Sequence, residues 1–178
     1  LEQYISVDDE TVLISGANLQ VINGTGGTDS ETGTGNIIIG YDEDDEDDDN
    51  DKTGSHNLVM GMANTYSSYG GIISGNQNEI SGPFSSVITG EDNIASGNFS
   101  SVSGGHHNTA SGEFSPVLGG HWNIASGERS SVSGGTSNVG FGSASSVSGG
   151  SDNNAGGDNS SVSGGFFNES IGVYSAIS

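Results

Sequence analysis

Most of this chain is a fifteen-residue repeat whose consensus is close to S-S-V-S-G-G-x-x-N-x-A-S-G-x-x, with six consecutive copies from Ser85 to Tyr174. A short fixed period is typical of stacked coils, in which each column of the repeat becomes a line of like side chains along the stack. Two columns do not vary, one of valine and one of asparagine: Val87, Val102, Val117, Val132, Val147 and Val162, and Asn93, Asn108, Asn123, Asn138, Asn153 and Asn168.

One repeat is too short for two helices and a turn, but it suffices for two short strands and two corners at about 3.3 Å per residue. We therefore predict an all-β fold, a parallel β-solenoid or β-roll with one coil per repeat. Side chains alternate along a strand, so the valines should face inward and their flanking serines outward. A small inner column on the second strand should face the valines: Ala95, Ala110, Ala125 and Ala155.

The corners are predicted from two glycine columns, which begin at Gly90 and Gly97. We expect both columns to have positive φ, because glycine adopts that conformation without steric cost. The asparagine that follows the first corner tolerates the left-handed region and can hydrogen-bond from coil to coil. The valine and asparagine columns are thus interpreted as structural.

The repeat pattern divides the chain into three parts. Residues 1–23 are expected to form a β-rich N-terminal cap or lead-in segment, and residues 24–57 an irregular first coil with an acidic insertion at 42–51. Residues 58–178 form the repeat solenoid, and we expect its incomplete last coil to be completed by further chain or by a neighbour.

Composition excludes several other classes of protein. The 32 glycines do not recur every third residue and there are only two prolines, which excludes collagen. No cysteine is present to form a disulfide scaffold, and no apolar stretch is long enough for a membrane-spanning segment. A formal net charge of −21 makes nucleic acid an unsuitable partner.

The S-V-S-G-G-x-x-N-x-A-S-G run resembles the head repeats of trimeric autotransporter adhesins of the YadA type, over residues 58–178. The segments T-G-N-I-I-I-G-Y-D-E, K-T-G-S-H-N-L-V-M-G and Y-S-S-Y-G-G-I-I-S-G are similar to a lead-in found before SVSGG repeats of bacterial surface proteins. The resemblance implies a left-handed parallel β-roll, three chains around a threefold axis, and a surface rod that binds host or matrix proteins. The unit here is one residue longer than the family's.

The thin core independently favours association into a homotrimer. Valine and alanine bury little area at about 25 cal/mol per Å², against about 1–2 kcal/mol of backbone entropy per residue. An aromatic column just before the serine pair either packs between chains or forms an exposed corner: Phe84, Phe99, Phe114 and Tyr174.

The acidic insertion is the first candidate metal site, since a dense set of carboxylates suits Ca²⁺. Its candidate ligands are Asp42, Glu43, Asp44, Asp45, Glu46, Asp47, Asp48, Asp49 and Asp51. The spacing is not that of an EF-hand, and a solvated loop without an ion is the alternative. The predicted fold requires no cofactor.

The coil corners are the second candidate site, because neighbouring coils lie about 4.8 Å apart and their corner side chains can touch. A transition-metal site of Glu91, His106 and His121 is one interpretation, and exposed histidines without a metal are the other. Corner side chains that could contact a binding partner are His106, His107, His121, Trp122, Phe166 and Phe167.

Together these features predict an extracellular or cell-surface bacterial protein that is not an enzyme, because no nucleophile and base and no paired carboxylates stand out. The main hypothesis is a trimeric adhesin-like rod that binds a matrix protein or glycan through its corners. The alternative is a subunit of a filament joined end to end by strand addition. An ice-binding solenoid or a polysaccharide-acting enzyme is less favoured, because the exposed row is serine and the acids are scattered.

Overall fold

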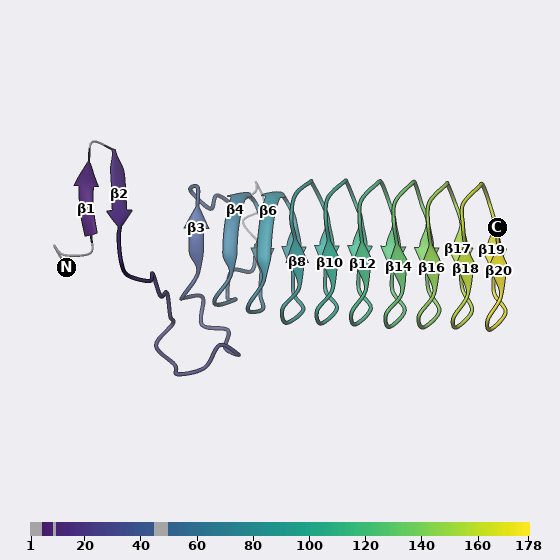
Figure 1. The fold of residues 1–178 in the computed structure, drawn as a ribbon, viewed down its shortest axis with the longest axis horizontal. Helices are drawn as coiled ribbons and strands as arrows, with labels where there is room; N and C mark the ends of the chain where they lie inside the picture. The colour runs from purple at the N-terminus through teal and green to yellow at the C-terminus, as the bar shows by residue number, and fades with distance from the viewer. Residues whose placement is uncertain (1–4, 9, 45–49) are drawn as a thin grey trace.

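The computed structural model describes residues 5–8, 10–44 and 50–178, and these residues form strands, turns and no helix (Figure 1). An antiparallel hairpin is followed by two parallel sheets of ten and eight strands, which form the two walls of a solenoid. From β4 onward, consecutive strands belong to alternate walls, so each pair of strands is one coil. The predicted all-β parallel solenoid is confirmed. The described part of the chain has no helix that could cross a membrane.

The strands are short and recur regularly. The hairpin consists of β1 (Ile5–Asp8) and β2 (Thr11–Ile14). The ten-stranded sheet contains β3 (Ile37–Ile39), β4 (Leu58–Met62), β6 (Ile72–Asn76), β8 (Ser86–Val87), β10 (Ser101–Val102), β12 (Pro116–Val117), β14 (Ser131–Val132), β16 (Ser146–Val147), β18 (Ser161–Val162) and β20 (Ala176–Ile177). The eight-stranded sheet contains β5 (Thr65–Tyr66), β7 (Glu79–Ile80), β9 (Ile94–Ala95), β11 (Thr109–Ala110), β13 (Ile124–Ala125), β15 (Val139–Gly140), β17 (Asn154–Ala155) and β19 (Glu169–Ser170).

The pairing register follows the repeat. Val102 pairs with Val87 on one side and with Val117 on the other, an offset of one repeat. Between β6 and β8 the register changes, because Ile73 pairs with Val87 whereas Asn76 bridges to Glu91. The coils before β8 are therefore one residue shorter at this corner than the coils that follow.

The core is one line of valines facing one line of alanines. Every valine of the repeat column is at most 1% exposed, and Ala95, Ala110, Ala125 and Ala155 are fully buried. Bulkier Tyr66 and Ile80 take the alanine position in the earlier coils. The predicted inner columns are confirmed. The first serine of the repeat, such as Ser100, is also buried, and in most coils its hydroxyl has no hydrogen-bond partner, whereas that of Ser115 donates to the carbonyl of Ala125 at 3.1 Å.

The two glycine columns have different physical causes. From Gly90 to Gly165 the first column has φ between 87° and 103°, as predicted. The expectation of positive φ for the second column is wrong. Glycine is needed there because a Cβ on Gly97 would lie 2.2 Å from the carbonyl oxygen of Gly112 in the next coil. The left-handed residue at that corner is instead Phe99, with φ of 56°.

The asparagine column forms a buried ladder of hydrogen bonds. The backbone N–H of Asn108 donates to Oδ1 of Asn93 at 3.0 Å, and its own Nδ2 donates to the carbonyls of Gly104 and Gly120 at 3.1 and 2.9 Å. The predicted ladder is confirmed. Although asparagine tolerates the left-handed region, the residue before it adopts that conformation here, as His107 does with φ of 55°.

The segment before β3 returns to the first coils. Gly33 N–H donates to the carbonyl of Thr53 at 2.7 Å, and Nδ2 of Asn36 donates to the carbonyl of Gly54 at 2.9 Å. The β1–β2 hairpin lies beyond this segment at the N-terminal end (Figure 1). These contacts attach the irregular N-terminal part to the regular stack.

Candidate functional site

The corner after the strands of the ten-stranded sheet carries a group of titratable side chains from neighbouring coils. Parallel bridges connect Glu91 to His106 and His106 to His121, so this backbone column continues from coil to coil. The next column contains Asp92 and His107, which both adopt the left-handed conformation. The corner therefore holds two adjacent rows of side chains on a hydrogen-bonded backbone.

Three of these side chains converge across two coils. Nε2 of His106 lies 3.4 Å from Oδ2 of Asp92, and Nε2 of His107 lies 3.8 Å from the same oxygen. The two imidazole rings are 3.9 Å apart between centroids. Glu91 is next to this group, with Oε2 at 3.9 Å from Nε2 of His106. The cluster is half-buried and faces solvent on one side.

His121 and Trp122 extend the two rows by one coil. The rings of His106 and His121 stack at 5.3 Å with an interplanar angle of 3°, and His107 stacks on Trp122 at 4.1 Å. The sequence led us to group Glu91, His106 and His121 as candidate ligands, but the structure brings together Asp92, His106 and His107. That diagonal contact depends on the left-handed residues, which the repeat pattern did not reveal.

Phe166 and Phe167 occupy the same two columns near the C-terminal end of the stack. Their rings meet edge to face with centroids 4.3 Å apart, and both side chains are exposed. Phe167 and Phe141 border a shallow hollow of about 330 Å³ with Asp152. The six predicted contact residues thus form two separate corner groups.

The described part of the acidic insertion is anchored to the solenoid. Nζ of Lys52 lies 2.5 Å from Asp44 and 3.5 Å from Asp42, and the hydroxyl of Tyr66 donates to Asp42 at 2.6 Å. Burial opposes the charge of Lys52, but the two carboxylates outweigh it and raise the pKa of the amine. Burial and the Asp42 contact raise the pKa of Tyr66.

The remaining acidic candidates are placed differently. The backbone carbonyl of Glu43 accepts the N–H of Ala63 at 2.7 Å. Asp51 accepts from the hydroxyl and N–H of Thr53 at 2.7 and 2.9 Å, which lowers its pKa. The candidates Asp45, Glu46, Asp47, Asp48 and Asp49 lie outside the described residues.

The calcium hypothesis for the insertion stays a prediction. We expect millimolar Ca²⁺ to raise the melting temperature of the chelated protein, since hard oxygen ligands at this density attract the ion. Thermal melts by circular dichroism with EDTA and after Ca²⁺ is added back would measure this. Identical melting curves with EDTA and with added Ca²⁺ would contradict it. Mg²⁺ at the same concentration is the matched control.

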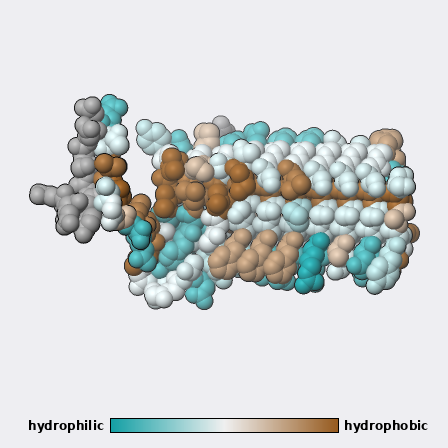
Figure 2. Space-filling view, in the orientation of Figure 1, coloured by the Kyte–Doolittle hydropathy of each residue, from teal (hydrophilic) through white to brown (hydrophobic). Residues whose placement is uncertain are grey.

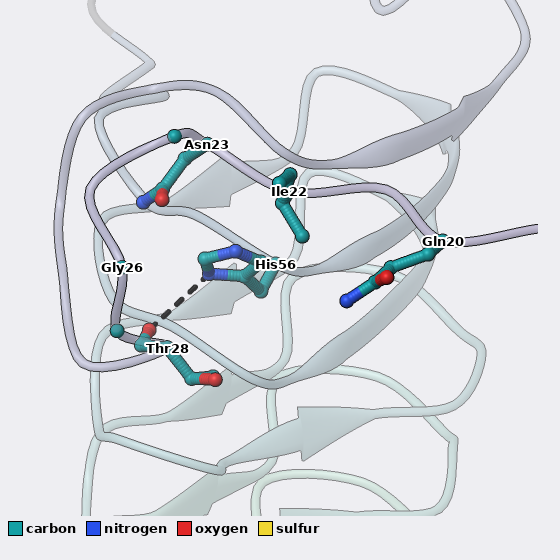
Figure 3. A pocket seen from close by; sticks show the side chains of 8 residues that line it. Gln20, Ile22, Asn23, Gly26, Thr28 and His56 are labelled. Atoms are coloured by element: carbon teal, nitrogen blue, oxygen red, sulfur yellow. Dashed lines mark hydrogen bonds between the residues drawn. The ribbon is translucent and has the colours of Figure 1, made fainter.

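A separate hollow of about 270 Å³ lies where residues 20–28 pass over the first coil (Figure 3). His56 lies at its centre, with Nδ1 3.3 Å from the carbonyl oxygen of Thr28, between Asn23 and Gln20. The contact of His56 with Thr28 in this hollow attaches the N-terminal segment to the stack.

An aromatic stack follows the opposite corner. Phe84, Phe99 and Phe114 are stacked with centroids 5.3 and 5.1 Å apart and interplanar angles of 11° and 6°. The edge of Tyr69 packs on one end of the row, and the guanidinium of Arg129 lies 5.9 Å from the last ring. Each phenylalanine is 43–49% exposed. The rings cover one another's faces and leave their edges to solvent.

No protein-family model matches the chain, and no curated protein matches it in sequence.

Proposed function

We propose that this chain is a structural and adhesive module of a bacterial surface rod, in which three parallel copies associate and the coil corners contact a matrix protein or glycan. The interior supports such a role, because the valine, alanine, serine and asparagine columns fill it. Contacts with other molecules then fall on the outer faces and corners.

The observation that carries the proposal is the exposed apolar surface along the rod. Figure 2 shows apolar side chains over the N-terminal strands of the ten-stranded sheet and a second row along the lower corners. Exposed apolar side chains on the strands of that sheet or directly after them include Ile37, Ile38, Ile39, Met62, Ile72, Ile88 and Leu118. Contiguous exposed apolar surface of this kind marks interaction sites in soluble proteins.

A second copy of the same chain suits this surface in a specific way. The stack of Phe84, Phe99 and Phe114 repeats at the spacing of the coils, and so does the register of the sheet. A parallel copy has the same spacing, so its coils can meet those of the first copy one by one over the full length. A partner without this period would contact only some of the rings.

The mass of the protein in solution tests the proposal. We expect light scattering at physiological salt to give three times the chain mass of 17.8 kDa. Substituting asparagine for Phe84, Phe99 and Phe114 should reduce the mass to that of one chain and leave the circular dichroism unchanged. Asn159 occupies the same column with φ of 55°, so asparagine suits this backbone.

A matched control tests whether the loss of mass is specific to the stacked phenylalanines. Phe166→Ser with Phe167→Asp places at the last corner the pair that the chain already has at Ser151 and Asp152, and this variant should keep the oligomeric mass. A wild-type monomer would contradict the trimer. Electron microscopy should show short rods, and indefinite fibres would favour the end-to-end filament instead.

A further inference from the structure

We propose that Asp92, His106 and His107 form a binding site for a divalent transition-metal ion of the Zn²⁺ type that links two neighbouring coils. One ligand atom from each residue can be chosen so that all three lie within 4.8 Å of one another. Ligand atoms about 2.0–2.2 Å from a tetrahedral Zn²⁺ are about 3.3–3.6 Å apart. The observed 3.4 Å and 3.8 Å from Asp92 to His106 and His107 approach this separation without backbone movement.

The chemistry of the donor atoms selects the class of ion. Two imidazole nitrogens and one carboxylate oxygen suit Zn²⁺ and its neighbours in the first transition row. Ca²⁺ prefers six to eight oxygen ligands, and this corner does not provide them. The carboxylate of Glu91, with Oε2 at 3.9 Å from Nε2 of His106, is close enough to become a fourth ligand by a side-chain rotation.

The backbone holds these ligands in place. The N–H of Asp92 donates to Asn76, that of His107 to Glu91, and that of His106 to Gly120, at 3.0–3.2 Å. The ligands therefore lie on backbone that is hydrogen-bonded to neighbouring coils, and only side-chain torsions need to adjust. This preorganisation favours binding, because little backbone freedom remains to be lost.

The site would act as a crosslink. Asp92 follows β8, whereas His106 and His107 follow β10, so one ion would connect consecutive coils. An ion that binds only the folded state raises the free energy of unfolding. Once its concentration exceeds the dissociation constant, this gain grows with the logarithm of the concentration. The site needs one chain only, so it does not depend on the proposed trimer or on adhesion.

Calorimetry with ZnCl₂ on the full chain, freed of metal and of any histidine tag, tests the proposal. We expect one ion per chain and a melting temperature that rises with Zn²⁺. Asp92→Ser, and the double variant His106→Thr with His107→Ser, should each weaken binding at least about tenfold, as expected for loss of a ligand. The double variant copies the Thr136 and Ser137 pair of this chain, so it should fold.

Two controls separate the site from general histidine binding. His121→Thr and His56→Ser remove imidazoles outside the cluster and should change the affinity less than about twofold. Co²⁺ should give the intense visible absorption of tetrahedral coordination in the wild type and not in Asp92→Ser. The absence of binding heat, or equal losses in His121→Thr and Asp92→Ser, would overturn the proposal.

Discussion

Gly112→Ala is expected to lower the free energy of unfolding by about 3 kcal/mol or more, because the added methyl group has no space. A Cβ on Gly112 would lie 2.1 Å from the carbonyl oxygen of Gly127. That oxygen accepts the N–H of Ser130 at 3.0 Å, so the backbone cannot retreat without breaking hydrogen bonds. Urea denaturation followed by circular dichroism measures the loss.

Gly140→Ala is the matched control for this substitution. Gly140 takes the place of the inner alanine in its coil, and a Cβ there would make an ordinary 3.4 Å contact with Cβ of Ser130. We expect this variant to be more stable than the wild type by about 0.4–1 kcal/mol, because the unfolded chain loses freedom. Similar losses in Gly112→Ala and Gly140→Ala would contradict the steric explanation.

The two glycine columns show what the sequence can and cannot predict. The repeat gave the coil, the register and the inner columns, because identical units that stack in parallel must align like residues. It did not separate Gly90, which is needed for its conformation, from Gly97, which is needed for close approach. Both causes produce an invariant glycine, and only the position of the next coil distinguishes them.

The candidate site, like the glycine columns, was predicted only in part. The columns put Glu91 beside His106 and Asp92 beside His107, but the contact of Asp92 with His106, which lies in the other column, needs the left-handed backbone at the corner. The pairing of Lys52 with the acidic insertion lies outside the repeat, where no periodicity guides a prediction. The repeat thus predicts the features that all coils share, whereas features of a single coil are seen only in the structure.

The second large effect is expected from Asn123→Ala. Nδ2 of Asn123 donates to the carbonyls of Gly119 and Gly135 at 2.9 and 3.0 Å, and its Oδ1 accepts the N–H of Asn138 at 3.0 Å. Alanine leaves the N–H of Asn138 and the carbonyl of Gly119 without these partners. A buried polar group that loses its partner costs about 1–3 kcal/mol, so the loss should amount to several kcal/mol.

Two further variants distinguish hydrogen bonding from volume. Asn123→Asp keeps the size and the acceptor but loses both N–H donors, and it buries a charge against carbonyl oxygens, so it should be at least as unstable as Asn123→Ala at neutral pH. Asn98→Ala changes an exposed asparagine and should alter stability by less than about 0.5 kcal/mol. A tolerated Asn123→Asp, measured by the same urea titration, would mean that the column fills space and that its donated hydrogen bonds do not hold the coils together.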